Sequence, residues 1–242
     1  MAKLKPEIKT KIKMNKEFLY GDENCFVRQD YFRHGLVYYT KGEEILNSLT
    51  HAIGGVLGIA ILVGFYLLSS NVYERAAAII SGITISLPYT NSAIYHGLTN
   101  LKMKSVWRKI DHSSICFIII GCATPMILCV SQSLYNFVAL SISLAVCVIN
   151  TVGCCINLKR FSKIALCLDF VVAFLFTASY ITMRNVIPFA SKICYVAGAA
   201  ICLIGMIAYG LRKKYIHTVF HVFMIVGTIV FFVAAYVIYG AF

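Results

Sequence analysis

Seven long apolar runs follow one another from residue 45 onward, and they constrain the fold more than any other feature of the sequence. Each approaches or exceeds the ~20 residues that a helix needs to cross the ~30 Å hydrocarbon core of a bilayer. Backbone polar groups in lipid must be satisfied internally, so runs of this length predict helices. The predicted spans are Ile45–Leu68, Ala76–Leu98, Ile110–Val130, Leu134–Leu158, Ile164–Met183, Ile193–Leu211 and Ile216–Phe242.

The composition supports the same fold class. The chain is 60% hydrophobic and 13% charged, whereas a soluble domain is about 25% charged and about 45–50% apolar. These values exclude a water-soluble globule, a disordered chain and a disulfide-rich secreted module. We therefore predict an all-α integral membrane protein, with a basic cytoplasmic segment at residues 1–43 and one seven-helix transmembrane domain at residues 44–242.

The distribution of basic residues predicts the orientation. Nineteen of the 22 lysines and arginines lie in the N-terminal segment or between predicted spans 2 and 3, 4 and 5, and 6 and 7. The other side holds three: Arg75, Arg184 and Lys192. The positive-inside rule then places the N-terminus in the cytoplasm and the C-terminus outside. The net charge of +12 thus reflects membrane topology rather than nucleic-acid binding. The six lysines among residues 1–16 act as a topology signal or bind anionic lipid.

Five of the six histidines fall in the half of the membrane that this charge count assigns to the cytoplasm. Ionisable residues within a membrane are costly and are candidates for function. His217 and His221 stand one helical turn apart on one face, and His96 ends the second predicted span. Three imidazoles with an open fourth position form a known type of catalytic zinc site. The alternative is a hydrogen-bond network between helix ends without metal.

Other polar residues at this depth complete the predicted site. Asp111 is a candidate for holding or deprotonating a water at the metal, and Ser92 lies one turn before the second-span histidine. Around them we expect supporting roles for three further residues: His51, Asn47 and His112. Asp169, in the fifth span, would hydrogen-bond a neighbouring helix, snorkel inward or line a cavity.

The blocks EEILNSLTHAIGG, SAIYH, KIDHSSICFIIIGCATP and HTVFHVFMIVGTIVFF resemble the hemolysin III group of the progestin and adipoQ receptor superfamily, which includes the adiponectin receptors. The resemblance implies a seven-helix bundle with the N-terminus inside and zinc near the cytoplasmic face. It implies that His96, His217 and His221 hold the zinc, with Asp111 near it through water and Ser92 one turn before the first ligand. Alkaline ceramidases share this constellation, so the resemblance implies hydrolysis of a lipid amide.

Three functions remain open from the sequence. The first is a zinc-dependent hydrolase of a lipid amide or ester, ceramide-like in chemistry. The second is a pore-forming or lytic protein, as the group's name implies, although no polar stripe runs the full length of a predicted span. The third is a non-catalytic receptor or sensor with structural zinc. The sequence indicates membrane lipids as partners and a lipid as substrate; it shows no nucleic-acid signature and no legible protein partner.

Overall fold

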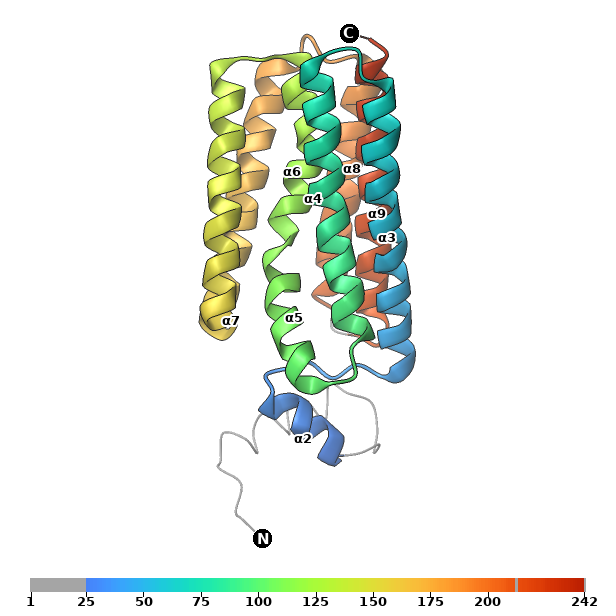
Figure 1. Ribbon diagram of the computed structural model, residues 1–242, viewed down its shortest axis with the longest axis vertical. Helices are drawn as coiled ribbons and strands as arrows, with labels where there is room; N and C mark the ends of the chain where they lie inside the picture. Colours follow the sequence, from blue (N-terminus) through green and yellow to red (C-terminus); the bar gives the residue numbers. More distant parts are fainter. Residues whose placement is uncertain (1–24, 212, 242) are drawn as a thin grey trace.

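The computed structural model describes residues 25–211 and 213–241, and the regular structure within those ranges is entirely helical. The predictions for residues 1–16 lie outside the described residues. An elongated bundle of upright helices forms the body of the molecule, and a short helix, α2, lies below its lower end (Figure 1). The helices are α2 (Cys25–Arg33), α3 (Lys41–Leu68), α4 (Val72–Gly97), α5 (Leu101–Ser113), α6 (Ile115–Pro125), the π-helix η1 (Met126–Val130), α7 (Leu134–Met183), α8 (Phe189–Tyr209) and α9 (Ile216–Tyr239).

The longest helix, α7, is broken at Asn157. The backbone there is non-helical, with φ −151° and ψ 84°, and it divides α7 into arms 134–156 and 158–183. The chain turns back at the bottom of the bundle at this point (Figure 1). Asn157 Oδ1 accepts the Arg160 N–H at 3.1 Å, which is the role of a side chain that caps the start of a helix. The two arms contain most of the predicted spans Leu134–Leu158 and Ile164–Met183.

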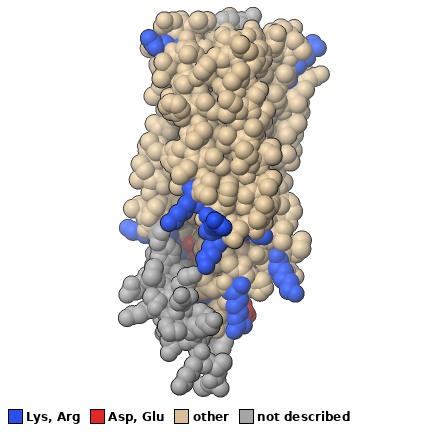
Figure 2. Space-filling view, turned by 90° about the vertical axis from the view of Figure 1, so that its left-hand side faces the viewer, with Lys and Arg blue, Asp and Glu red and all other residues tan. Residues whose placement is uncertain are grey.

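The outer surface of the bundle is that of a membrane protein. Large apolar side chains stand exposed along its length, and a broad uncharged belt separates the basic residues at the two ends (Figure 2). Contiguous exposed apolar surface on this scale indicates a lipid-facing region. The protein is therefore an integral multi-pass membrane protein. Among the described residues, five helical stretches are long and apolar enough to cross a membrane: Lys41–Leu68, Leu101–Val130, Leu134–Met183, Phe189–Tyr209 and Ile216–Tyr239.

Close contact between α3 and α4 is made by glycines of α3. A Cβ added at Gly58 would lie 2.5 Å from the Ser86 backbone nitrogen, and one added at Gly54 would lie 2.6 Å from the Tyr89 ring. Small residues at such positions let two membrane helices approach closely. This packing holds the start of α3 beside the end of α4.

The start of α3 is also joined to the start of α9. Thr40 and Glu43 form a capping box, so α3 begins four residues before the predicted span. Glu43 Oε1 in addition accepts the Tyr215 N–H at 2.9 Å. Tyr215 adopts a left-handed conformation, with φ 61°, immediately before α9. This contact between two first turns brings α9 into place beside the end of α4.

Candidate metal centre

Three histidine side chains converge where the end of α4 meets the first two turns of α9. His217 Nε2 lies 3.2 Å from His96 Nε2 and 3.0 Å from His221 Nε2. One ligand atom from each ring lies within 4.8 Å of the other two. His96 and His221 are buried, and His217 is half-buried. The structure thus brings together the three residues that the sequence analysis proposed as ligands.

The spacing of the three ring nitrogens fits a metal ion. Zinc–nitrogen bonds of about 2.0–2.1 Å in a tetrahedral site place ligand nitrogens roughly 3.3 Å apart. The two separations of 3.0 and 3.2 Å are close to this value. Hydrogen bonds alone satisfy such a cluster poorly, because a neutral imidazole carries a single N–H. The buried His96/His217/His221 cluster could therefore bind a metal ion.

A carboxylate orients the His96 ring. His96 Nδ1 lies 2.7 Å from Glu44 Oε2. With Glu44 ionised beside the Lys104 ammonium, the carboxylate only accepts, so the proton sits on Nδ1 and the Nε2 lone pair faces the cluster. Metal-binding histidines commonly make this second contact, which fixes the tautomer and raises ligand basicity. The sequence analysis did not assign Glu44 a role in the site. The sequence does place Glu44 on one polar face of α3 together with Asn47 and His51, and that pattern could have indicated its role. We call these three residues the polar stripe of α3.

Glu44 is itself held by a buried lysine. Lys104 Nζ lies 3.0 Å from Glu44 Oε1 and is almost fully enclosed. The same ammonium donates to three carbonyl oxygens at the end of α4, those of Tyr95, His96 and Leu98. A buried ammonium is stable only when it is paired and hydrogen-bonded, and these contacts meet that need. Lys104 thus ties α5, the end of α4 and Glu44 into one unit.

On the α9 side, the first turns of α3 fix the other two histidines. Asn47 is fully buried, and its Oδ1 accepts the Thr218 hydroxyl at 2.5 Å. The Asn47 backbone hydrogen-bonds the His221 ring, and Thr50 Oγ1 lies 3.4 Å from His221 Nδ1. These contacts set the rotation of α9 about its own axis. Both Nε2 atoms of the His217–His221 pair consequently face His96.

Comparison with known proteins identifies the family. A sequence profile described as haemolysin-III related matches residues 39–232, a range that includes all three histidines. The chain belongs to this family. It is 28% identical over 199 residues to the Hemolysin-3 homolog of Bacillus subtilis (strain 168), covering 80% of this chain and 93% of the relative. It is 25% identical over 206 residues to Hemolysin-3 of Bacillus cereus, covering 78% and 89% of the two chains.

The resemblance drawn from the sequence blocks is thereby confirmed. In this haemolysin-III family member, Ser92 is buried on α4 one turn before His96, and its hydroxyl has no hydrogen-bond partner of good geometry among the described residues. The Asp111 side chain, at the end of α5, interacts with Ser92. Asp111 does not join the group of ligand atoms that lie within 4.8 Å of one another. Its place near the cluster, but outside it, leaves its predicted role as a proton acceptor a prediction.

The other two histidines of the predicted site lie in different surroundings. His51 stacks on the His221 ring, with centroids 3.5 Å apart and planes 21° from parallel. Both His51 ring nitrogens are buried without a hydrogen-bond partner in the described chain. His112 follows Asp111 and instead lines a separate cavity between α5 and α7. Neither ring belongs to the converging group of ligand atoms.

Aromatic rings cover the histidines in this haemolysin-III family member. Tyr39 stacks on His217 at 5.1 Å between centroids and meets His96 edge-on at 5.6 Å. Tyr209, at the end of α8, approaches His217 at 5.3 Å. Burial raises the pKa of Tyr39 well above its ordinary value, so this ring stays a neutral phenol. The sequence analysis missed both tyrosines, since neither belongs to a periodic pattern.

Asp169 belongs to another polar group. It lies in the second arm of α7 and accepts from Asn150 Nδ2 of the first arm at 3.3 Å. Cys154 Sγ donates to Asn150 Oδ1 at 3.5 Å. Of the alternatives left open by the sequence, a hydrogen bond to the neighbouring helical arm is the one observed. This contact joins the two arms of α7 and does not reach the histidines.

Proposed function

We propose that this protein is a zinc-dependent hydrolase of a lipid amide or ester with ceramide-like chemistry. The observation that carries the proposal is the convergence of three imidazole Nε2 atoms from α4 and α9 at the spacing of tetrahedral ligands. Three protein ligands leave a fourth position open, which is typical of catalytic rather than structural zinc. All-nitrogen ligation by histidine favours zinc over magnesium or calcium, which prefer oxygen.

The proposal includes a topology of seven spans. The two arms of α7 count as two crossings, and α4 stands within the bundle between helices that are apolar enough to cross on their own (Figure 1). The end of the molecule that carries the histidines also carries most of the lysines and arginines of the described chain (Figure 2). By the positive-inside rule this end faces the cytoplasm. The N-terminus then lies inside and the C-terminus outside.

Zinc bound by the three imidazoles would supply Lewis acidity toward a substrate carbonyl and an attacking water. Glu44 would keep the His96 lone pair directed at the metal through the Nδ1–H contact. Asp111 would accept the proton of the attacking water and later donate it to the leaving amine or alcohol. Ser92 Oγ, buried and without a good partner, would orient Asp111 or donate to the carbonyl oxygen as negative charge develops there.

The position of the site favours a lipid substrate. Its three ligands lie at one end of helices whose outer faces carry exposed apolar side chains. A substrate with acyl chains could keep them in the membrane while its polar amide or ester reaches the histidines at the membrane boundary. A water-soluble substrate would gain no binding energy from a site at the membrane boundary. The likeness to alkaline ceramidases in the sequence blocks points to the same substrate class.

The proposal is tested by assaying purified protein on a short-chain ceramide and on an ester analogue, with and without a zinc chelator. We expect turnover that stops on chelation and returns with zinc. Asp111→Asn should lower turnover by about 10²–10⁴-fold while the metal is retained. Asp169→Asn, a matched change at a carboxyl group that contacts Asn150, should leave turnover within a few-fold of wild type. Absence of turnover, or turnover that persists in His217→Ala, would refute the proposal.

The names of the two relatives, Hemolysin-3 homolog and Hemolysin-3, favour a second candidate, a lytic protein. Release of a dye from liposomes separates the two functions. A lytic role that is independent of the metal predicts equal release by wild type and by the His217→Ala, His221→Ala double variant. The hydrolase predicts no release by either protein when the liposomes lack a cleavable substrate.

A further inference from the structure

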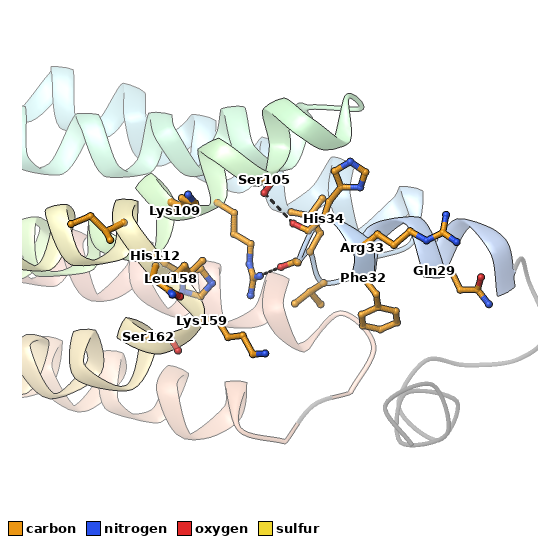
Figure 3. A pocket seen from close by; sticks show the side chains of 16 residues that line it. Gln29, Phe32, Arg33, His34, Ser105, Lys109, His112, Leu158, Lys159 and Ser162 are labelled. Carbon is orange, nitrogen blue, oxygen red and sulfur yellow. Dashed lines mark hydrogen bonds between the residues drawn. The ribbon is translucent and has the colours of Figure 1, made fainter. Parts of the chain in front are cut away.

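A cavity of about 860 Å³ lies at the basic end of the molecule, apart from the histidine cluster. It is open on one side and is lined by the end of α2 and the segment that follows it, by α5, and by the break in α7. Lys109 and His112 of α5 and Lys159 of α7 line one side, and Phe32, Arg33 and His34 line the other (Figure 3). The proposed hydrolase does not use this cavity.

The lining is strongly basic. Arg33, Arg108, Lys109 and Lys159 all contribute to it, and none of the described residues that line the cavity is acidic. Arg33 is paired with Asp30 at 3.2 Å. Arg108 donates to the Gly35 carbonyl and also interacts with Asp111. The remaining cations, Lys109 and Lys159, form no ion pair with a carboxylate of the described residues.

These two lysines keep their charge available for a ligand. Lys109 Nζ donates to the Cys155 carbonyl oxygen at 3.0 Å, a contact that is neutral and leaves the positive charge uncompensated. Lys159 is exposed and makes no hydrogen bond or ion pair with any described residue. Arg108 Nε, on the same wall, is buried without a hydrogen-bond partner in the described chain. A cavity with unused cations and an unused N–H donor suits a phosphate group.

The surroundings favour a phosphate that is attached to a lipid. Ile156, which also lines the cavity, exposes 76% of its surface, and Phe32 exposes 36%. Ile156 ends the first arm of α7, whose outer face is apolar. The cavity therefore adjoins the lipid-facing surface at the level of the basic residues. A phospholipid could place an acyl chain against Ile156 and its headgroup among the lysines, whereas free phosphate would leave the apolar wall unused.

From these contacts we propose that the α2–α5–α7 cavity binds the headgroup of an anionic phospholipid from the leaflet at the basic end of the protein. Two lysines form the centre of the site. Each basic residue near an anionic membrane surface contributes about 1 kcal/mol, or roughly fivefold in affinity. Loss of both charges should therefore weaken binding by about 30-fold. The proposal does not depend on metal or on hydrolysis.

The test titrates detergent-solubilised full-length protein with dioctanoyl phosphatidic acid and follows the fluorescence of its single tryptophan, Trp107, which lies on α5 two residues before Lys109. Dioctanoyl phosphatidylcholine and inorganic phosphate serve as the neutral-lipid and free-anion probes. We expect saturable binding of phosphatidic acid with a stoichiometry of one by native mass spectrometry. The other two probes should bind at least tenfold more weakly.

The matched variants are Lys109→Gln, Lys159→Gln and Lys102→Gln, Lys163→Gln. Each pair removes one charge from α5 and one from α7, and the second pair lies outside the cavity. The cavity pair should lose about 30-fold in affinity for phosphatidic acid, and the control pair less than threefold. Lys159→Gln alone, which leaves the Lys109–Cys155 contact intact, should lose about fivefold. Equal losses in the two pairs, or equal binding of phosphatidylcholine or inorganic phosphate, would overturn the proposal.

Discussion

Glu44 and Glu74 are enclosed at opposite ends of the α3–α4 pair, and they use their carboxylates differently. Glu74 accepts the Ser70 N–H at 2.5 Å and the Asn71 side chain at 2.9 Å, both within four residues of itself. Glu44 is bound by His96 and Lys104, which come from other helices. The first carboxylate completes the start of its own helix. The second contacts an imidazole of another helix, so of these two carboxylates Glu44 is the one placed to orient a candidate metal ligand.

The largest effect should follow removal of two ligands. The His217→Ala, His221→Ala double variant should lose bound zinc completely, because one remaining imidazole cannot hold the ion against solvent. Metal analysis of the purified protein checks this. Helical content by circular dichroism should stay near that of wild type, since packing elsewhere in the bundle is unaltered. Full zinc retention in the folded double variant would end the metal hypothesis.

The second-largest effect should come from replacing Glu44, and the same change at Glu74 serves as the comparison. Glu44→Gln should weaken zinc binding by about 10–100-fold, the usual cost of losing the partner that orients a metal-binding histidine. Glu74→Gln should leave zinc affinity unchanged and lower the free energy of unfolding by about 1–2 kcal/mol. Zinc titration and thermal unfolding of both variants measure the two quantities. Similar zinc affinities in the two variants would contradict the conclusion that Glu44 orients His96 and Glu74 does not act on the histidines.

A fall in pH should lower zinc affinity at the histidine end of the molecule before it changes the helical content of the bundle. Imidazole must be neutral to bind metal, so protons compete with zinc once the pH is low enough to protonate the ligands. We expect zinc affinity to fall by about tenfold or more per pH unit once the metal-free histidines begin to take up protons, while the helical content is unchanged. Equilibrium dialysis against buffered zinc, together with circular dichroism, separates the two responses. An affinity that stays constant down to the pH at which the bundle unfolds would contradict histidine ligation.

The smallest effect concerns the rotation of α9. Thr218→Val removes the hydroxyl that donates to Asn47 Oδ1 but keeps the shape of the side chain. Zinc affinity should fall only about two- to fivefold, as expected for the loss of one neutral hydrogen bond of about 0.5–1 kcal/mol. Thr177→Val, on the second arm of α7, is the matched control and should not change it. A larger loss in the control than in Thr218→Val would show that the contact does not position the site.

The apolar runs predicted the helices, and helical periodicity together with the charge count predicted the histidine cluster. His217 and His221 share a helical face wherever α9 lies, and the charge count placed His96 at the same depth. Glu44 could be placed on the polar stripe of α3, but its pairing with a residue 52 positions away depends on how α3 and α4 pack. Tyr39 precedes the first span without any periodic signal. The α2–α5–α7 cavity could not be predicted, because its position depends on the exact residue, Asn157, at which α7 breaks.

The separation of the ligands along the chain also has a consequence for biosynthesis. His96 and His217 are 121 residues apart, and the second is carried by the last helix of the described chain. A ribosome adding about 5–20 residues per second needs on the order of 10 s to cover that interval. Throughout it, His96 is inserted without its partners. The metal ion that we propose would therefore be acquired only after α9 has been made, and a nascent chain stalled before α9 would not hold it with all three histidines.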